Sequence, residues 1–181
     1  MKITQTAIPE VLVLTPRVFC DARGAFFETY NEQTMREAGL PTEWRQDNCS
    51  VSLKNVVRGI HYQVTQPQGK LVRVMYGAVL DVAVDLRRSS PTFGQHVAVE
   101  LSEENGAMLW IPPGFGHGFA VLSEKAGFAY KVTDYYSPTG ERTILWNDPK
   151  IGIAWPISES EAIVSDKDRQ GKTLDDAEVF A

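Results

Sequence analysis

Apolar and polar residues alternate in short stretches along most of the chain. The clearest stretch is "LDVAVDL" (80–86), where every second residue is leucine or valine and the residues between them are Asp81, Ala83 and Asp85. A period of two places successive side chains on opposite faces of a β-strand. This stretch therefore predicts a strand with two chemically different faces.

Most of the other apolar stretches also have the length and composition of strands. We predict strands at "FFETY" (26–30), "CSVSL" (49–53), "VVRGIHYQV" (56–64), "QHVAVEL" (95–101), "AMLWI" (107–111), "GFAVL" (118–122), "FAYKVTDYY" (128–136) and "RTILW" (142–146). The longer run "KLVRVMYGAVLDVAVDLR" (70–87) predicts two strands that meet at Tyr76-Gly77. Turn signals such as "RRSSPTFG", "IPPGFG" and "YSPTGE" separate these runs.

Only one segment has the pattern of a helix, "NEQTMREAGL" (31–40). Asn31 is suited to the N-cap position, Glu32 lies in the first turn, and Gly39 can end the helix. Many short strands with so little helix favour an all-β fold, an antiparallel sandwich or barrel.

The chain of 181 residues has the length of one domain, and no internal repeat or low-complexity linker divides it. After Pro156 the sequence turns polar and charged, with too few apolar residues for a core of its own. We therefore expect residues 1–181 to form a single domain, with the C-terminal tail packed across it.

Composition and charge narrow the function classes. The chain has 18 Lys and Arg against 23 Asp and Glu, a net charge of −5, whereas a nucleic-acid partner favours a strongly basic face. The longest apolar run is far shorter than the ~20 residues of a membrane-spanning helix. No signal-peptide pattern opens the sequence, so we expect a cytoplasmic protein. Cys20 and Cys49 fit no metal or redox spacing and are expected to be free thiols.

Candidate chemistry gathers in "VVRGIHYQVTQPQGKLVRV" (56–74), an apolar run that carries Arg58, His61 and Lys70. A histidine that acts as a general base needs a partner, usually a carboxylate, to orient its imidazole and stabilise the imidazolium. An ordinary core or surface histidine is the alternative for His61. The candidate partners are Asp81, Asp85, Asp166 and Asp168, and the sequence alone does not choose among them.

The basic residues nearby suit an anionic ligand. Arginine binds phosphate in a bidentate manner and lysine supplies a compact charge, although each can also be a solvated surface residue. Arg58 and His61 point to opposite faces of a regular strand, and a bulge at Gly59 would bring them together. Arg23 lies in the turn-like "CDARGAFF".

Aromatic residues are the other recurring signal. Tyr130, Tyr135 and Tyr136 crowd one segment, and "WIPPGFGHGF" presents His117 on a rigid turn. A tyrosine near a charged pocket can donate a proton and an aromatic face can stack on a nucleobase, but most such residues pack in cores.

A metal site is not favoured by the spacing. His61, His96 and His117 stand in separate segments, and in "HVAVE" one histidine and one glutamate share a strand face without a further histidine. Catalytic zinc and iron sites usually need three protein ligands.

The segments "DARGAFFETYN", "RQDNCSVSLKNVVRGIHYQ", "QGKLVRVMYGAVLDVAVDLRRSSPTFG", "LWIPPGFGHGF", "YKVTDYYSPTGERTILWNDP" and "SDKD" together resemble dTDP-4-dehydrorhamnose 3,5-epimerases, in order from about Asp21 to Asp168. The resemblance implies a cupin-type jelly roll, usually a homodimer, that works without metal or organic cofactor. It also implies a thymidine-diphosphate-linked 4-keto-6-deoxyglucose substrate, on the route to L-rhamnose, inverted at both carbons beside the ketone.

The resemblance also implies roles for single residues. His61 resembles the base, Asp168 its partner, Lys70 the group that stabilises the enolate oxygen, and Tyr130 the proton donor. The positions that match the lining of the nucleotide-sugar site are Arg23, Glu28, Gln46, Asn48, Arg58, His117, Glu141 and Lys167, with Tyr136 as a stacking partner for thymine.

Four other functions remain open at this point. Relatives of the same fold epimerise one carbon only or isomerise the keto-sugar. A cupin that binds a sugar nucleotide without catalysis and a metal-dependent cupin oxygenase are the alternatives from other classes.

Overall fold

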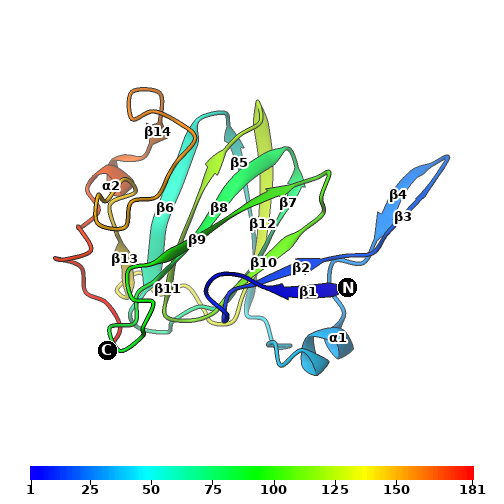
Figure 1. Ribbon diagram of the computed structural model, residues 1–181, viewed down its shortest axis with the longest axis horizontal. Coiled ribbons are helices and arrows are strands. Elements are labelled where there is room, and N and C mark those ends of the chain that lie inside the picture. Colours follow the sequence, from blue (N-terminus) through cyan, green and yellow to red (C-terminus); the bar gives the residue numbers. More distant parts are fainter.

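Two antiparallel sheets that face each other form the body of the computed structural model, which describes all residues, 1–181 (Figure 1). The first sheet has the strand order β1 (Lys2–Gln5), β2 (Leu12–Thr15), β10 (Met108–Ile111), β7 (Lys70–Tyr76), β12 (Lys125–Val132) and β5 (Gln46–Leu53). The second has the order β13 (Glu141–Thr143), β6 (Val56–Gln63), β11 (Phe115–Val121), β8 (Ala78–Asp85) and β9 (His96–Ser102), with β14 (Ile163–Val164) parallel to β6.

The chain crosses repeatedly from one sheet to the other. From β5 to β8 each strand lies in the sheet opposite its predecessor, and β9 to β13 continue this exchange. The crossing from β7 to β8 occurs at Gly77, whose φ of 80° suits glycine. This two-sheet arrangement confirms the all-β, cupin-type jelly-roll prediction.

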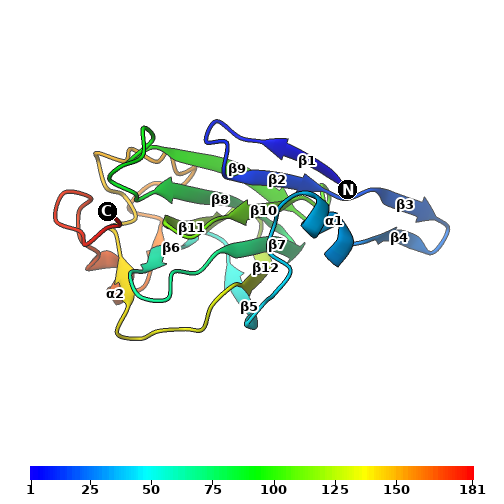
Figure 2. The same ribbon diagram turned by 90° about the horizontal axis from the view of Figure 1, so that it is seen from below.

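A separate hairpin of β3 (Val18–Asp21) and β4 (Gly24–Phe27) projects away from the sandwich (Figures 1 and 2). Helix α1 (Glu32–Glu37) follows it, and Asn31 caps the helix by accepting a hydrogen bond from the Thr34 amide. The predicted helix is confirmed, since Gly39 with a φ of 70° follows its end. Helix α2 (Asp166–Arg169) lies in the C-terminal tail, and neither helix is long and apolar enough to cross a membrane.

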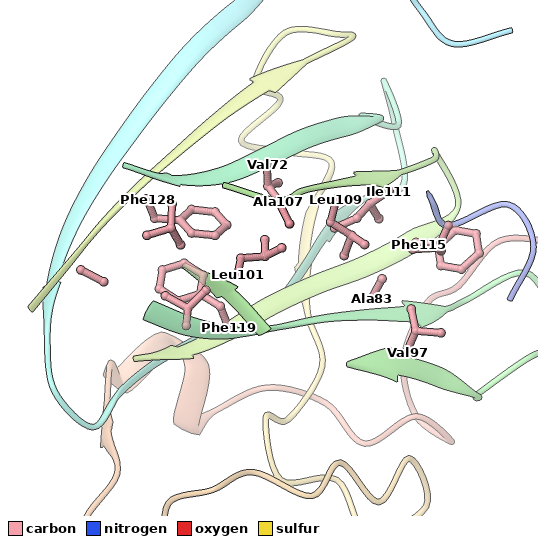
Figure 3. Close-up of a cluster of buried hydrophobic side chains, with 14 of the residues drawn as sticks. Val72, Ala83, Val97, Leu101, Ala107, Leu109, Ile111, Phe115, Phe119 and Phe128 are labelled. Atoms are coloured by element: carbon pink, nitrogen blue, oxygen red, sulfur yellow. The ribbon is translucent and has the colours of Figure 1, made fainter. Parts of the chain in front are cut away.

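The main core lies between the two sheets. Phe119 and Phe128 stack there with their ring centroids 4.3 Å apart, surrounded by aliphatic side chains from both sheets (Figure 3). On the other face of the second sheet, Val82, Val84 and Leu86 pack against a separate cluster that includes Leu174 and Ala177 of the tail. The two alternating sets of residues in "LDVAVDL" thus lie on opposite faces of the second sheet, and both faces are buried. The C-terminal tail covers the face that carries Val82, Val84 and Leu86.

Several strand boundaries differ from the prediction. The stretch 26–30 leaves the sheet after Phe27, the stretch 128–136 after Val132, and 142–146 after Thr143, while β1, β2 and β3 were not predicted. Beyond Val132 the backbone and side chain of Thr133 bond to Gly69 instead of extending the ladder with β5. Polar residues, Glu28 and Thr133, follow two of these strands at their ends, whereas β13 is followed by the apolar Ile144, which still exchanges backbone hydrogen bonds with Ile60.

Candidate active site

A β-bulge shapes the strand that carries His61. In the pairing of β11 with β6, His117 lies opposite His61 and Phe119 lies opposite Arg58, so three steps on β6 match two on β11. Gly59, with a φ of 128°, occupies the irregularity. The bulge that Gly59 was expected to permit is present, and Arg58 and His61 line one cavity.

His61 pairs with one of the four candidate carboxylates. Its Nε2 lies 2.5 Å from Oδ1 of Asp168, which is only 3% exposed, and the Gly59 amide donates to Asp168 Oδ2 at 3.2 Å. Burial alone would raise the pKa of Asp168, but the hydrogen bond and charge of His61, with further hydrogen bonds from Gly59 and Ser165, outweigh burial and lower it. An ionised Asp168 accepts from Nε2–H and leaves Nδ1 to take up a proton.

The local sequence explains how Asp168 reaches this place. Ser165 caps α2 by accepting from the Asp168 amide, and β14 just before it pairs with β6. The tail is thereby held beside the strand that carries His61. The other three candidate carboxylates do not contact His61: Asp81 pairs with His117, Asp85 with Arg87, and Asp166 is exposed.

Lys70 is a buried cation close to the dyad. It is the first residue of β7, is 9% exposed, and its Nζ has one hydrogen bond, to the His61 carbonyl at 3.4 Å. Burial lowers the pKa of Lys70 to about 8, while the charges of Asp81 and Glu141 oppose this effect. Lys70 is thus mainly protonated at neutral pH, with N–H groups left free for a ligand.

Tyr130 lies on β12, next to β7 in the same sheet. Burial raises the pKa of Tyr130, so its phenol is protonated and can donate. Two cavities, of about 130 and 160 Å³, share His61, Lys70 and Tyr130 in their linings. The sequence-predicted catalytic residues are therefore adjacent in space.

The rim of these cavities carries an ionic network. Glu141 accepts from the Tyr136 hydroxyl at 2.9 Å and pairs with Lys167 at 2.5 Å, and the Tyr136 amide donates to Gln46. Burial alone would raise the pKa of Glu141, but these two hydrogen bonds outweigh it and lower the pKa. Asn48 lies opposite Tyr130 in the pairing of β5 with β12.

Two of the expected binding residues lie elsewhere. Arg23 sits at the turn of the β3–β4 hairpin with its side chain 90% exposed and paired with Asp21. Glu28 follows the hairpin and accepts from Asn31. Because the hairpin projects from the sandwich (Figure 1), the expectation that both line the pocket does not hold within one chain.

One buried partnership was missed by the sequence analysis. His117, 7% exposed, has its Nε2 2.9 Å from Oδ2 of the fully buried Asp81. A carboxylate on a strand face shared with Val79 and Ala83 was the available signal, since unpaired aspartates are seldom buried. No three His, Cys, Asp or Glu side chains lie together in an arrangement that could hold a metal ion.

Comparison with known proteins gives a consistent result. The family model described as dTDP-4-dehydrorhamnose 3,5-epimerase matches residues 5–176. The dTDP-4-dehydrorhamnose 3,5-epimerase of Pseudomonas aeruginosa is 56% identical over 181 residues, covering 99% of both chains.

Solved structures agree. A Legionella pneumophila dTDP-6-deoxy-D-glucose-3,5-epimerase, crystallised with dTDP-4-keto-L-rhamnose, is 48% identical with a TM-score of 0.94, over 98% of this chain and 94% of that one. A 3'-monoepimerase of Streptomyces bikiniensis, in complex with dTDP-quinovose, is 34% identical with a TM-score of 0.88, over 94% and 87%.

Proposed function

The chain belongs to the dTDP-4-dehydrorhamnose 3,5-epimerase family of isomerases, and from this premise we propose the reaction and the residues that perform it. The substrate is dTDP-4-dehydro-6-deoxy-D-glucose, and inversion of the two carbons beside its ketone gives dTDP-4-dehydro-L-rhamnose. The observation that carries this proposal is the cavity lining that joins the His61–Asp168 dyad, buried Lys70 and protonated Tyr130.

In the proposed mechanism His61 removes the proton from a carbon next to the ketone. Its bond to Asp168 orients the imidazole and stabilises the imidazolium, and a placed base contributes ~10²–10⁴-fold in rate. The electron pair moves onto the ketone oxygen, where the Lys70 ammonium stabilises the enolate by about 3–4 kcal/mol, by analogy with oxyanion-hole donors. Tyr130 returns a proton to the opposite face of the ring, which inverts the carbon.

The nucleotide end of the substrate calls for cations and an aromatic face. Arg58 has one side-chain hydrogen bond, from Nε to Ser52, which leaves its guanidinium available for a phosphate. Lys167 at the rim supplies a second charge, and the half-exposed Tyr136 ring supplies a surface for thymine. Gln46, Asn48, His117 and Glu141 complete the proposed binding set. Because the reaction only exchanges protons, it calls for no redox cofactor.

The active assembly in this proposal is a homodimer. The β3–β4 hairpin exposes Phe26 by 71% and Phe19 by 51%, although such side chains usually find an apolar partner. Docked on a second copy of the chain, the hairpin would bury these rings and carry Arg23 and Glu28 to the partner's site. In that arrangement Arg23 and Glu28 can bind substrate at the partner's site, although neither lines the cavity of its own chain.

The test is turnover of the thymidine-diphosphate 4-keto-6-deoxyglucose in deuterated water, read by mass spectrometry and product NMR against a no-enzyme control. Enzyme-dependent uptake of two deuterium atoms, one on each side of the ketone, is the expected result. Uptake at one carbon would instead identify a one-carbon epimerase, the activity named for the Streptomyces bikiniensis protein. No uptake would overturn catalysis and leave a sugar-nucleotide-binding cupin, and metal analysis would then address the oxygenase alternative.

A further inference from the structure

We propose that Asp81 is a positioning residue, which holds Lys70 in its cationic form and His117 in one tautomer beneath the substrate. This role presupposes the epimerase function above, because it concerns the cation that stabilises the enolate. Asp81 itself does not touch the substrate: it is fully buried near the middle of β8, on the strand face that points between the two sheets.

Only one oxygen of the Asp81 carboxylate has a protein partner. Oδ2 accepts from His117, while Oδ1 is buried and accepts no hydrogen bond from any group of the protein. An unsatisfied buried charged oxygen costs free energy, typically about 1–3 kcal/mol or more. If Asp81 served packing alone, an uncharged side chain of similar size at this position would make the protein more stable.

Lys70 also has unused hydrogen-bonding capacity, although no hydrogen bond or ion pair joins it to Asp81. Its ammonium is buried and makes a single long hydrogen bond, yet it has three N–H donors. Burial opposes a charge on Lys70 more strongly than any other influence, and the charge of Asp81 is the largest influence that favours it, ahead of Glu141. Each of the two buried charges thus lowers the free-energy cost of burying the other. Glu141 contributes less, because its carboxylate is also bonded to Lys167 and Tyr136.

His117 completes the arrangement. Burial lowers the pKa of His117, and that of Asp81 is raised by burial although His117 and Lys70 oppose this. In the proposed arrangement a neutral His117 imidazole donates Nε2–H to Oδ2 of an ionised Asp81. The titratable and charged groups around Lys70 are then Asp81 on β8, His117 on β11, Arg58 and His61 on β6, Tyr130 on β12 and Glu141 on β13.

The sign of the pH effect follows from the negative charge that Asp81 adds to the surroundings of Lys70. Lys70 must be protonated to stabilise the enolate, so the rate falls as pH rises through its pKa of about 8. Without the negative charge of Asp81, the cation is less favoured and the pKa of Lys70 falls further. The alkaline limb of the kcat profile therefore moves to lower pH, whereas Tyr130, whose pKa is raised, does not titrate in this range.

The test compares the kcat profile of Asp81→Asn with that of the wild type between pH 6 and 9. We expect the alkaline midpoint to fall by about one unit, which makes kcat about tenfold lower above that midpoint. Because Asp81→Asn leaves the buried charge of Lys70 less compensated, we expect the free energy of unfolding at pH 7 to decrease, and the midpoint of the profile, which stability does not determine, is the measurement that tests the proposal. A uniform loss of kcat with an unmoved midpoint would overturn the proposal.

Two control variants make the result specific. Lys70→Arg keeps a cation that does not titrate, so residual turnover should lose the alkaline limb and identify it with Lys70. Asp85→Asn removes the other fully buried carboxylate from the same face of β8, bonded to Arg87 and not to Lys70, and should leave the midpoint unchanged.

A readout without turnover separates this inference from the proposed function. NMR of ¹³C-labelled lysine follows the titration of Lys70, assigned by its loss in Lys70→Arg. A lower midpoint in Asp81→Asn supports the inference even if the wild type fails the deuterium test. An equal midpoint in both proteins would refute it even if the wild type is an active double epimerase.

Discussion

At the scale of single residues, the dyad joins two side chains that are 107 positions apart in the chain. Asp168 accepts from His61 and from the Gly59 amide, so its carboxylate is bound from two directions and holds the imidazole at the cavity. Lys70 and Tyr130 face the same space from the first sheet. The chemistry proposed here therefore depends on contacts between the sheets and not on one motif.

We expect His61→Ala to lower kcat by at least ~10²-fold, because it removes the proposed base and the other histidine of the cavity, His117, is buried and bonded to Asp81. Substrate binding should remain measurable by calorimetry, since the phosphate and base contacts lie on other residues. His96→Ala is the matched control: His96 begins β9 at the far edge of the second sheet and should retain turnover. Near-normal activity of His61→Ala would refute the assignment of the base.

At the scale of elements, the bulge in β6 is the feature that brings Arg58 and His61 to one cavity. The backbone of Gly59 lies so close to β11 that an added Cβ would sit 2.5 Å from the Gly118 Cα and 2.9 Å from the His117 carbonyl oxygen. The Gly59 amide also donates to Asp168. Strand geometry and dyad geometry are therefore linked at this one residue.

Gly59→Ala should accordingly lower both stability and turnover. We expect a loss of about 2–3 kcal/mol in the free energy of unfolding, from the clash and the positive φ together. Urea unfolding and kcat are the measurements. Gly152→Ala is the control for positive φ alone, since an added Cβ there meets nothing closer than 3.8 Å, and it should cost less and spare kcat. Equal effects of both variants would contradict the role of the bulge.

A second element-level feature is the loop after β8. Asp85 accepts from Arg87, Ser90 and Thr92 and so holds the turn that leads to β9. Burial by itself would raise the pKa of Asp85, but these hydrogen bonds outweigh burial and bring it down to about 2. The folded-state pKa lies below the unfolded value of about 4, so the stabilisation is present above pH 4 and is lost as the pH falls toward 2.

Asp85→Asn should therefore be less stable than the wild type by about 1–2 kcal/mol at pH 7. The difference between the two proteins should shrink as the pH is lowered from 5 to 2, because the wild type loses its ionised carboxylate there. Urea unfolding across this range measures it. A difference that stays constant with pH would show that the charge of Asp85 contributes nothing.

At the scale of the whole molecule, the body of the chain is well packed, but the β3–β4 hairpin is not part of it (Figure 2). In the proposed dimer one site contains His61 of its own chain and Arg23 of the other. Assembly and catalysis are then linked, because a monomer has an incomplete site.

Mixed dimers test this link. Arg23→Ala and His61→Ala should each be impaired alone, but a mixed dimer has one site with both residues intact. Random reassortment makes half of the dimers mixed, so activity should return to about a quarter of the wild-type value. Recovery that does not exceed the sum of the separate variants, or a monomer in light scattering, would contradict the exchange of the hairpin.

The local features could be predicted from the sequence because they have local causes. The helix with Asn31 as its cap, the two faces of "LDVAVDL" and the strand change at Gly77 each follow from side-chain spacing or backbone freedom over a few residues. The family resemblance predicted the jelly-roll fold and the set of candidate site residues, and the comparisons support the family. The roles of those residues stay predictions until they are measured.

Only the tertiary structure decided which groups meet. Residue spacing alone left four carboxylates available to His61 and the family resemblance pointed to Asp168, but the contact itself depends on the topology that places the tail beside β6. The same packing buries Asp81 against His117 and leaves Arg23 on a projecting hairpin. The physical reason is that periodicity determines the face on which a side chain lies, whereas its partner depends on which distant strands the chain brings together.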